Sequence, residues 1–372
     1  MNNADKNGIC FVTFSNNCDH QEACFSISDA LRPFIRTFNV GINNPKYKSK
    51  FDDASFYFDC PKRPGICKGS FKFSIIRKIA KKILDLKVEF VFFESSHLWN
   101  LFLINQLRNR VKIVQVIHDV IPHSDSRGMK TCNKFLCKRA DYIVLKSKKY
   151  YGELKRIYGV NQEKVYFLPI TRDYPKKQFQ PTNDGKPVFL FFGRIRKYKG
   201  IDVVLKMATD LPNVNFMVVG SPDSETSNTV LQLKQLSNVQ VVDREVTDQE
   251  ANYYFRLASY VILPYESATQ SGVVADSYKN SRPVIAFNVG ALSEQVKDGV
   301  SGFLIENGNV SDFEKKILSL SSQNFNRAKM SSDAFAFGFS QYSCYAAVDS
   351  FISFFTSISN IDNRSIISND CK

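Results

Sequence analysis

Cationic residues that follow an apolar run in the middle of the chain could bind a diphosphate. The run Val188–Phe192 is typical of a buried strand, and Gly193 after it allows a tight turn. Arg194 and Lys199 come next; an arginine can fork across two phosphate oxygens, and a lysine supplies a point charge. A solvated basic loop is the alternative, because Arg196 and other basic residues lie in the same segment.

A polar turn follows a second apolar run, Tyr260–Leu263. The turn Ser267–Gly272 precedes a helical pattern, so its backbone N–H groups could face an anion. Asp276 lies one helical turn further on and could accept hydrogen bonds from a ribose diol. An ordinary strand, loop and helix with an exposed acid is the alternative. After the next strand candidate, Pro283–Phe287, Gly290 opens a further short helix.

Histidines and acids near strand ends are the candidates in the first half of the chain. His118 follows the strand candidate Val111–Ile117, and adjacent strand residues point to opposite faces, so His118 and Asp119 are not a natural acid–base pair. Binding to the backbone and contact with a substrate are both open for His118. All four histidines lie in the first third without metal-ligand spacing, so we expect no bound metal.

The elements that must position these residues follow an alternating pattern. Short β-branched and aromatic runs alternate with helical patterns, which predicts βαβ units and parallel sheets. The expected strands are Ile9–Ser15, Val88–Phe93, Val111–Ile117, Tyr142–Leu145, Val165–Leu168, Val188–Phe192, Asn215–Val219, Val239–Val242, Tyr260–Leu263 and Pro283–Phe287. The expected helices are Gln21–Ile35, Phe71–Leu86, Leu98–Arg108, Lys148–Tyr158, Asp202–Thr209, Thr229–Leu236, Asp248–Ala258, Ser271–Asn280 and Ala291–Val296.

The resulting fold class is α/β, with two doubly wound Rossmann-like domains facing a central cleft. We expect a basic first domain over residues 1–170, a polar linker over 171–186 and a second domain over 187–335, and the resemblance described below implies that the first binds an acceptor and the second a donor. Residues 336–372 are expected to form a C-terminal helix, which could pack back on the first domain, and a loose tail.

Net charge is concentrated in one half of the chain. Residues 1–175 hold 30 Lys and Arg against 16 Asp and Glu, so 30 − 16 = +14, whereas the remainder holds 20 of each. A basic half implies an anionic partner, namely a membrane surface, a nucleic acid or a phosphorylated substrate. No basic groove with interleaved aromatic residues and no known nucleic-acid module is apparent, so we do not expect nucleic acid.

A basic amphipathic helix is predicted within this half. In Phe71–Leu86 the residues Ile75, Ile76, Ile79 and Ile83 share one face, and lysines gather on the other. This is the chemistry of a helix on a membrane surface, or of a core helix with a solvated charged face. The charge excess favours the membrane. The nine cysteines have irregular spacing and no signal peptide precedes them, so we expect a cytoplasmic protein at the inner face of the cell membrane.

The order of the motifs resembles the donor half of family 4 glycosyltransferases, which are retaining enzymes of the GT-B fold. The motifs are GR-x4-KG, VVG, LPY-x4-QSG, PVIAFNVGALSE and DG-x-SGFL, within residues 188–310. The stretches FFESSHLWN, VIHDVIPH and RADYIVLKS resemble the acceptor half of members that assemble bacterial polysaccharides. No single motif is specific, but the set is specific jointly.

The resemblance implies roles for individual residues. Arg194 and Lys199 would neutralise the diphosphate, and His118 would reach the donor sugar across the cleft; these three are the expected catalytic residues. Glu94 and His97 would lie on the acceptor side. The expected donor-binding residues are Gly193, Glu266, Thr269, Gln270, Ser271, Gly272, Asp276 and Gly290.

One position departs from the family pattern. Asp276 occupies the place of the second Glu of the family's E-x7-E pair, but the first Glu is replaced by Ala268. Glu266 lies two residues away and could substitute for it. This departure leaves the residue that contacts the sugar hydroxyls open.

The function implied is transfer of a hexose-type sugar from a UDP- or GDP-sugar to a hydroxyl of a glycan or polyprenyl-linked saccharide, with retention of anomeric configuration and without a cofactor. This would serve cell-surface polysaccharide synthesis. Two alternatives are a GT-B sugar-nucleotide epimerase or hydrolase, and a non-catalytic glycan-binding or accessory subunit, for which Ala268 is the best argument.

Overall fold

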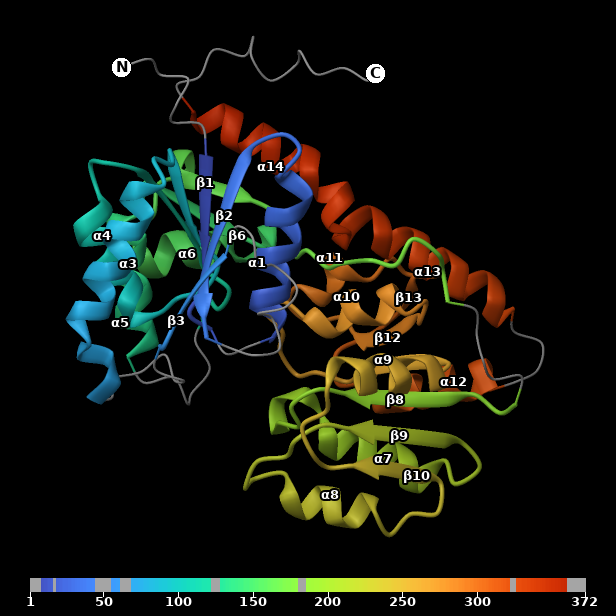
Figure 1. Ribbon diagram of the computed structural model, residues 1–372. Coiled ribbons are helices and arrows are strands. Elements are labelled where there is room, and N and C mark those ends of the chain that lie inside the picture. Colours follow the sequence, from blue (N-terminus) through green and yellow to red (C-terminus); the bar gives the residue numbers. More distant parts are fainter. Residues whose placement is uncertain are drawn as a thin grey trace, which may run out of the picture. The chain divides into compact units, whose positions relative to one another are not determined.

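The computed structural model describes residues 8–15, 18–43, 55–60, 68–121, 128–179, 185–321 and 326–359. The chain forms two compact units (Figure 1). Unit 1 contains residues 1–173 and 342–372, and unit 2 contains residues 174–341. The chain therefore passes from one unit to the other within the expected linker and returns six residues after the expected start of the C-terminal segment. His123 and the tail beyond residue 359 lie outside the described residues.

Unit 1 is built on a seven-stranded sheet in the order β3-β2-β1-β4-β5-β6-β7, with every neighbouring pair parallel. Its strands are β1 (Gly8–Val12), β2 (Arg36–Ile42), β3 (Ser55–Phe58), β4 (Phe90–Phe93), β5 (Lys112–Val116), β6 (Tyr142–Leu145) and β7 (Val165–Phe167). Its helices are α1 (Cys18–Leu31), α3 (Phe73–Asp85), α4 (Leu98–Leu107), α5 (Met129–Arg139), α6 (Tyr151–Tyr158) and α14 (Cys344–Ile358), with 3-10 turns at Lys68–Phe71, Lys148–Tyr150 and Gln162–Lys164.

Apolar side chains cover both faces of this sheet, which is why its central strands are continuous apolar runs. On one face α3, α4, α5 and α6 pack over side chains such as Val12, Phe93 and Ile143. On the other face α1 and α14 pack over Phe11, Phe92 and others. Figure 1 shows the sheet between these two helical layers. Unit 1 is thus a three-layer sandwich held mainly by burial of aromatic and aliphatic area.

The apolar face of α3 belongs to this core. Ile76, Ile79 and Ile83 are fully buried, and Ile75 packs against the same cluster. Of the two interpretations of this helix, the structure therefore supports the core helix with a solvated charged face, because the isoleucines already cover the sheet. What remains exposed on α3 is its charged face together with two aromatic side chains near its start, Phe71 and Phe73.

The C-terminal helix α14 completes the core of unit 1. Its Phe351 and Phe355 rings lie 5.9 and 6.2 Å from the ring of Phe92 in the central strand β4. Just before this helix, the chain runs beside the segment that leaves unit 1: the Arg172 amide donates to the Tyr342 carbonyl, and the Cys344 amide donates to the Arg172 carbonyl. Helices α1 and α14, from opposite ends of the sequence, thus lie in the same helical layer on one face of the sheet.

Unit 2 has a six-stranded parallel sheet in the order β10-β9-β8-β11-β12-β13. Its strands are β8 (Val188–Phe192), β9 (Asn215–Val219), β10 (Val239–Val242), β11 (Tyr260–Leu263), β12 (Val284–Phe287) and β13 (Gly302–Ile305). Its helices are α7 (Ile201–Asp210), α8 (Ser227–Leu233), α9 (Asp248–Leu257), α10 (Gly272–Lys279), α11 (Leu292–Gln295), α12 (Val310–Ser321) and α13 (Arg327–Tyr342), with a 3-10 turn at Lys197–Lys199.

Both sheets reverse their strand order at one point, and these points position the candidate sites. In unit 1 the reversal lies between β1 and β4, and in unit 2 it lies between β8 and β11. Ligands of doubly wound folds bind outside the carboxyl ends of the strands at such a point. The predicted class of two Rossmann-like α/β domains is confirmed.

Candidate functional site

The loops after β8 and β11 meet at the switch point of unit 2. The Lys199 amine lies 5.4 Å from the centre of the Tyr265 ring, and it would be 3.5 Å from a Cβ placed on Gly193. The Glu266 amide donates to the Tyr198 carbonyl at 2.8 Å, which ties the two loops together. The structure therefore brings the predicted residues Gly193 and Lys199 to the same place, at the carboxyl end of β8.

Gly200 makes this approach possible. Its φ is +76°, in the left-handed region that favours glycine, and a Cβ there would stand 1.9 Å from the Pro264 carbonyl oxygen. A side chain at this position would push the loop that carries Lys199 away from the end of β11. The close approach of Gly200 to Pro264 thus explains the glycine that follows Lys199 in the GR-x4-KG motif.

Two arginines of the same loop have different environments. Arg196 donates to the Ile195 and Ser221 carbonyls, and its Nε lies 3.2 Å from an Asp223 carboxylate oxygen. Arg194 is exposed, and it makes no hydrogen bond or ion pair with any residue that the structure describes. Arg196 therefore fixes the loop, whereas Arg194 is the guanidinium available to an anionic ligand.

The turn before α10 is clamped by a glutamine that was not predicted from the sequence. Gln295, at the end of α11, accepts from the Ser271 amide at 2.9 Å and donates to the Ser271 carbonyl at 3.0 Å. The Ser271 N–H group thus already donates a hydrogen bond within the protein, and binding of the donor by this turn stays a prediction. Of the other turn residues, Thr269 and Gln270 are half-buried, and Gly272 begins α10.

Ala268, which replaces the first Glu of the E-x7-E pattern, points into the protein interior. Ala268 is buried, and its carbonyl accepts from the Ala291 amide at 2.9 Å. Glu266 is exposed, while Asp276 is half-buried on α10. Gly290 has a left-handed φ of +49° in the loop after β12, and its carbonyl accepts from Ser293 Oγ. The predicted donor residues thus all come from the loops after β8, β11 and β12 and from the first turns of α10.

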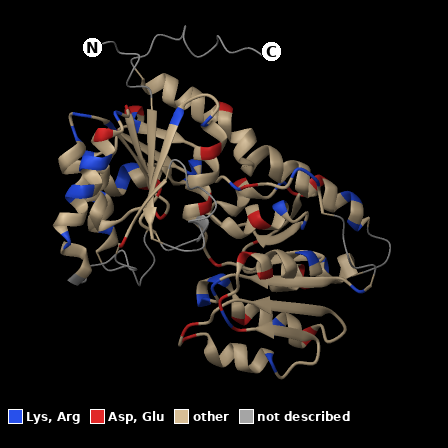
Figure 2. Ribbon diagram, viewed as in Figure 1, with Lys and Arg blue, Asp and Glu red and all other residues tan. Residues whose placement is uncertain are grey.

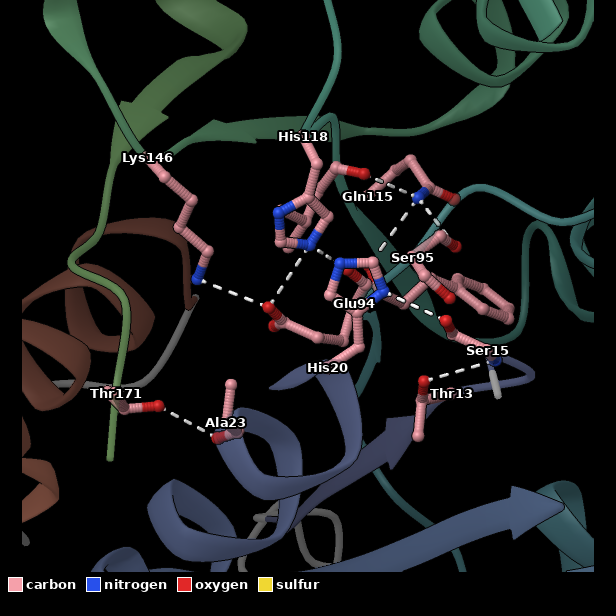
Figure 3. A network of polar contacts seen from close by, with 12 residues as sticks. Thr13, Ser15, His20, Ala23, Glu94, Ser95, Gln115, His118, Lys146 and Thr171 are labelled. Atoms are coloured by element: carbon pink, nitrogen blue, oxygen red, sulfur yellow. Dashed lines mark hydrogen bonds and ion pairs between the residues drawn. The ribbon is translucent and has the colours of Figure 1, made fainter. Parts of the chain in front are cut away.

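A buried polar network occupies the corresponding edge of the sheet in unit 1 (Figure 3). Glu94 directly follows β4, and its side chain is 1% exposed; its Oε1 lies 3.5 Å from the Lys146 amine and 3.3 Å from His118 Nε2. Burial by itself would raise the pKa of Glu94, but the charge of Lys146 and the hydrogen bond from His118 outweigh it and lower the pKa. Glu94 is therefore an ionised carboxylate in the interior.

His118 lies in this network together with a second histidine. Its Nε2 is 2.6 Å from the Glu94 carbonyl oxygen, and its ring stacks on that of His20 with centroids 4.2 Å apart. His20 Nδ1 in turn lies 3.0 Å from Ser15 Oγ, just after β1. Strand ends β1, β4, β5 and β6 thus converge here. Glu94 and His118 were predicted from the sequence, whereas His20 and Lys146 were missed.

His97 has a structural place instead. It caps α4, because its Nδ1 accepts from the Trp99 amide at 3.1 Å, while its Nε2 lies 3.8 Å from Cys60 Sγ. Burial lowers the pKa of His97 to about 4, so the ring is neutral at pH 7. These contacts account for a histidine at this position through helix capping, and none of them points to an acceptor.

Neither a metal cluster nor a membrane span emerges from the described ranges. Among those residues, no group of three or more His, Cys, Asp or Glu side chains could hold a metal ion. Likewise, in that part of the chain no helix has the length and apolar character to cross a bilayer.

The sequence of unit 2 matches a known family. Residues 173–336 match the family described as "Glycosyl transferases group 1". The matched segment spans less than half of the chain. It includes the loops that carry Arg194, Lys199 and Gln295, and it corresponds closely to unit 2.

Relatives support the same domain. An uncharacterized glycosyltransferase of Methanocaldococcus jannaschii is 31% identical over 165 residues, which are 44% of this chain and 42% of the relative. The D-inositol 3-phosphate glycosyltransferase of Mycolicibacterium smegmatis is 30% identical over 158 residues, 41% of this chain and 36% of the relative. The chain thus matches less than half the length of these curated relatives.

Solved structures share the fold over nearly the whole chain. HepE of Anabaena, in complex with UDP and glucose, has a TM-score of 0.76 at 14% identity and covers 95% of this chain and 100% of its own. A glycosyltransferase from Rickettsia africae has a TM-score of 0.72 at 16% identity, covering 98% and 99% of the two chains. At these identities the likeness concerns the fold, and that fold includes unit 1 as well as unit 2.

Proposed function

We propose that this protein is a retaining glycosyltransferase of family 4 that moves a hexose-type sugar from a UDP- or GDP-sugar to a hydroxyl of a glycan or lipid-linked saccharide in cell-surface polysaccharide synthesis. The observation that carries the proposal is the Lys199 amine beside Gly193, next in sequence to the exposed Arg194, at the switch point of a segment that matches the glycosyl transferases group 1 family. HepE, whose fold is similar, binds UDP-glucose.

The charges at this switch point suit the difficult step of the reaction. The bond between the anomeric carbon and the diphosphate oxygen breaks, and the diphosphate leaves with its negative charge. Arg194 and Lys199 would stabilise that charge, because groups already in place need no rearrangement when the charge develops. The acceptor oxygen then bonds to the anomeric carbon on the same face, and the departing diphosphate takes the acceptor's proton. We assign contact with the transferred sugar to His118.

Nucleotide binding is the first test. In a thermal-shift panel of UDP, GDP and their sugars, we expect one nucleotide to stabilise the chain, by about 2.7 kcal/mol at 100 times its Kd. Replacing Arg194 with Ala should remove at least about half of this stabilisation, because a hydrogen bond to a charged group contributes roughly 1.5–3 kcal/mol. Lys197→Ala is the matched control, since Lys197 is an exposed cation of the same loop.

The outcomes of this panel separate the assignments. Equal stabilisation of wild type and Arg194→Ala by the same nucleotide would remove the phosphate role of Arg194. Stabilisation that falls equally in Lys197→Ala would indicate a general effect of loop charge. The absence of stabilisation by any nucleotide or nucleotide-sugar would contradict the proposed function itself.

An accessory role is the second candidate, and Ala268 favours it. The carboxylate that the family pattern places here is replaced by a buried methyl group. A binding subunit would retain affinity for a nucleotide-sugar and release no nucleotide in the presence of acceptors. Nucleotide release measured with saccharide and polyprenyl-linked acceptors distinguishes the two functions.

For the acceptor we propose a lipid-linked saccharide at an anionic membrane on the cytoplasmic side. The support lies in the exposed basic residues of unit 1. Arg77, Lys78 and Lys81 are exposed on α3, and Lys130, Lys134, Lys138 and Arg139 are exposed on α5. Figure 2 shows these helices as the most densely blue part of the unit. The contact would be electrostatic, because the isoleucines of α3 are buried in the core.

A further inference from the structure

Gln295 has a buried amide side chain that the proposed chemistry does not use. It ends α11 and is 7% exposed. Its Oε1 accepts from the Ser271 amide at 2.9 Å, and its Nε2 donates to the Ser271 carbonyl at 3.0 Å. One side chain thus binds both polar groups of one backbone residue, as a residue of a neighbouring strand would. Ser271 is the N-cap of α10 and is itself buried.

The backbone of Gln295 is fixed by a second set of buried contacts. Its carbonyl accepts from Tyr278 Oη at 3.2 Å, and the same hydroxyl lies 2.8 Å from Ser301 Oγ. Ser301 Oγ also accepts from the Lys297 amide at 2.9 Å. Because Tyr278 and Ser301 are fully buried, these contacts hold the end of α11 in the packed interior of unit 2. The place of the Gln295 amide is therefore set by the core and not by the turn that it binds.

A further contact ties the other end of the same turn to α11. The Ala291 amide, at the start of α11, donates to the Ala268 carbonyl at 2.9 Å. The turn from Ala268 to Ser271 is therefore held at both of its ends by the segment 291–295. Both contacts use backbone groups of the turn, so its conformation depends on α11 whatever side chains it carries.

The turn held in this way adjoins the candidate donor site. It leads into the first helical residues of α10, Gly272 and Val273. A Cβ placed on Gly193 would lie 3.5 Å from Val273 Cγ2 and 3.5 Å from the Lys199 amine. The first N–H groups of a helix have no acceptor within the helix and favour an anion. The place of these groups beside the cationic loop depends on the turn that Gln295 holds.

We propose that Gln295 is a positioning residue for donor binding: its amide holds the turn before α10 in the conformation that receives the donor's phosphates before the donor arrives. The proposal rests on the proposed function in so far as this turn contacts the donor. A turn that is already ordered loses little conformational entropy when the donor binds, which raises affinity. Without the amide, the buried N–H and carbonyl groups of Ser271 would lose their partners, and the turn would rearrange to reach water.

Nucleotide affinity tests this role. The probe is UDP or GDP, whichever stabilises wild type in the thermal-shift panel, and its Kd is measured by isothermal titration calorimetry. Gln295→Met keeps the length of the side chain and removes both hydrogen bonds to Ser271. We expect Kd to rise about tenfold, which corresponds to a turn that adopts its binding conformation about one tenth of the time.

The matched control is Ser277→Ala, at the other end of the same helix. Ser277 is fully buried, and its Oγ donates to the Arg282 carbonyl at 2.7 Å. Loss of this hydrogen bond should lower the melting temperature, as in Gln295→Met, but leave Kd within about twofold of wild type. A purely structural role for Gln295 would give the same pattern in both variants. A folded Gln295→Met chain with the wild-type Kd, or an equal rise of Kd in both variants, therefore rejects the positioning role.

Hydrogen exchange of the Ser271 amide gives a test that needs no variant. Because Gln295 binds this amide without any nucleotide, its exchange in free wild type should be at least about 100-fold slower than in an unfolded chain. Rapid exchange in the free chain that slows only after nucleotide is added would mean that the nucleotide orders the turn, which contradicts the proposal. This measurement decides the question if Gln295→Met does not fold.

Failure of this inference and failure of the proposed function give different results. A wild-type chain that binds none of the nucleotides or nucleotide-sugars would contradict the proposed function, and the donor-positioning role would fall with it even if the Ser271 amide exchanges slowly. Nucleotide binding with an unchanged Kd in Gln295→Met would remove only the role of Gln295. If sugar transfer is detected, the donor KM of Gln295→Met should rise about tenfold while its acceptor KM changes less than about twofold. An equal rise in both KM values would count against a role at the donor turn.

Discussion

At the scale of single residues, His97 makes the stability of the chain depend on pH. Its pKa falls from 6.5 to about 4 through burial, so the unfolded chain binds a proton that the folded chain does not bind between these values. The stabilisation is complete above pH 6.5 and is lost as the pH falls toward 4. At pH 5 this loss amounts to about 2 kcal/mol.

A variant without this titration should lose less stability in acid. Asn also caps helices well, so His97→Asn keeps an N-cap for α4 while removing the ionisable ring. Urea unfolding at pH 7 and pH 5 should show a decrease smaller by about 2 kcal/mol in His97→Asn than in wild type. Equal decreases in both chains would mean that the folded state accepts the proton on His97 without penalty.

The sequence could identify a site residue only where the local pattern marks its position, and not where its role depends on a partner far away in the sequence. Arg194 and His118 stand close after apolar runs, and Lys199 follows in the same loop as Arg194, so the pattern places all three at the carboxyl ends of strands. Lys146 also follows a strand, but its partner Glu94 is 52 positions away in the numbering, and no local pattern links the two. Gln295 was missed for the same reason, because it binds Ser271 across a loop.

At the scale of elements, one glycine sets how closely α13 packs. A Cβ on Gly338 would stand 2.3 Å from Tyr278 Cβ and 2.7 Å from Tyr174 Oη. We expect Gly338→Ala to destabilise the chain by roughly 1–3 kcal/mol, the usual cost of overpacking. Gly152→Ala is the control: a Cβ added to this glycine of α6 would have nothing within 4 Å, so the change should be neutral or stabilising by up to about 1 kcal/mol.

Thermal melting of the two variants gives the answer. Because both substitutions replace a helical glycine by alanine, a lower melting temperature for Gly338→Ala than for Gly152→Ala reports the tight packing against α10. A melting temperature for Gly338→Ala at or above that of Gly152→Ala would mean that α13 can move away from Tyr278 without loss.

Elements with strong apolar runs were predicted with nearly correct bounds, among them Val188–Phe192 and Tyr142–Leu145. Those that were missed lack such a run or mix their signals. The edge strand β3 (Ser55–Phe58) has four half-buried residues, and α5 carries basic residues around a small buried face. In α13 the aromatic residues are interleaved with Ala, Ser and Gly, so its pattern is weak. The burial of the α3 isoleucines also depended on tertiary packing, which periodicity alone cannot distinguish from a membrane face.

At the scale of the whole molecule, the charge asymmetry predicts binding to anionic lipid through unit 1. The substitution of Arg77, Lys78 and Lys81 by Gln removes three exposed charges of α3 and leaves its buried face intact. Each basic residue near an anionic leaflet contributes about 1 kcal/mol, so binding to phosphatidylserine vesicles at low salt should weaken by about two orders of magnitude. Co-sedimentation with the vesicles measures this.

The control has the same change in net charge but acts on unit 2. Gln substitutions at Lys206, Lys315 and Lys329 remove three exposed lysines, each paired with an aspartate, and should leave vesicle binding within about threefold of wild type.

Because an exposed contact is screened, binding of wild type should also disappear near 1 M salt, where the Debye length is about 3 Å. If both triple variants bind equally, net charge alone attracts the protein. If wild type stays in solution at low salt, the proposed membrane contact is wrong. Loss confined to the α3 variant would place the membrane contact on unit 1, the half of the fold that lies outside the group 1 family match and that carries His118.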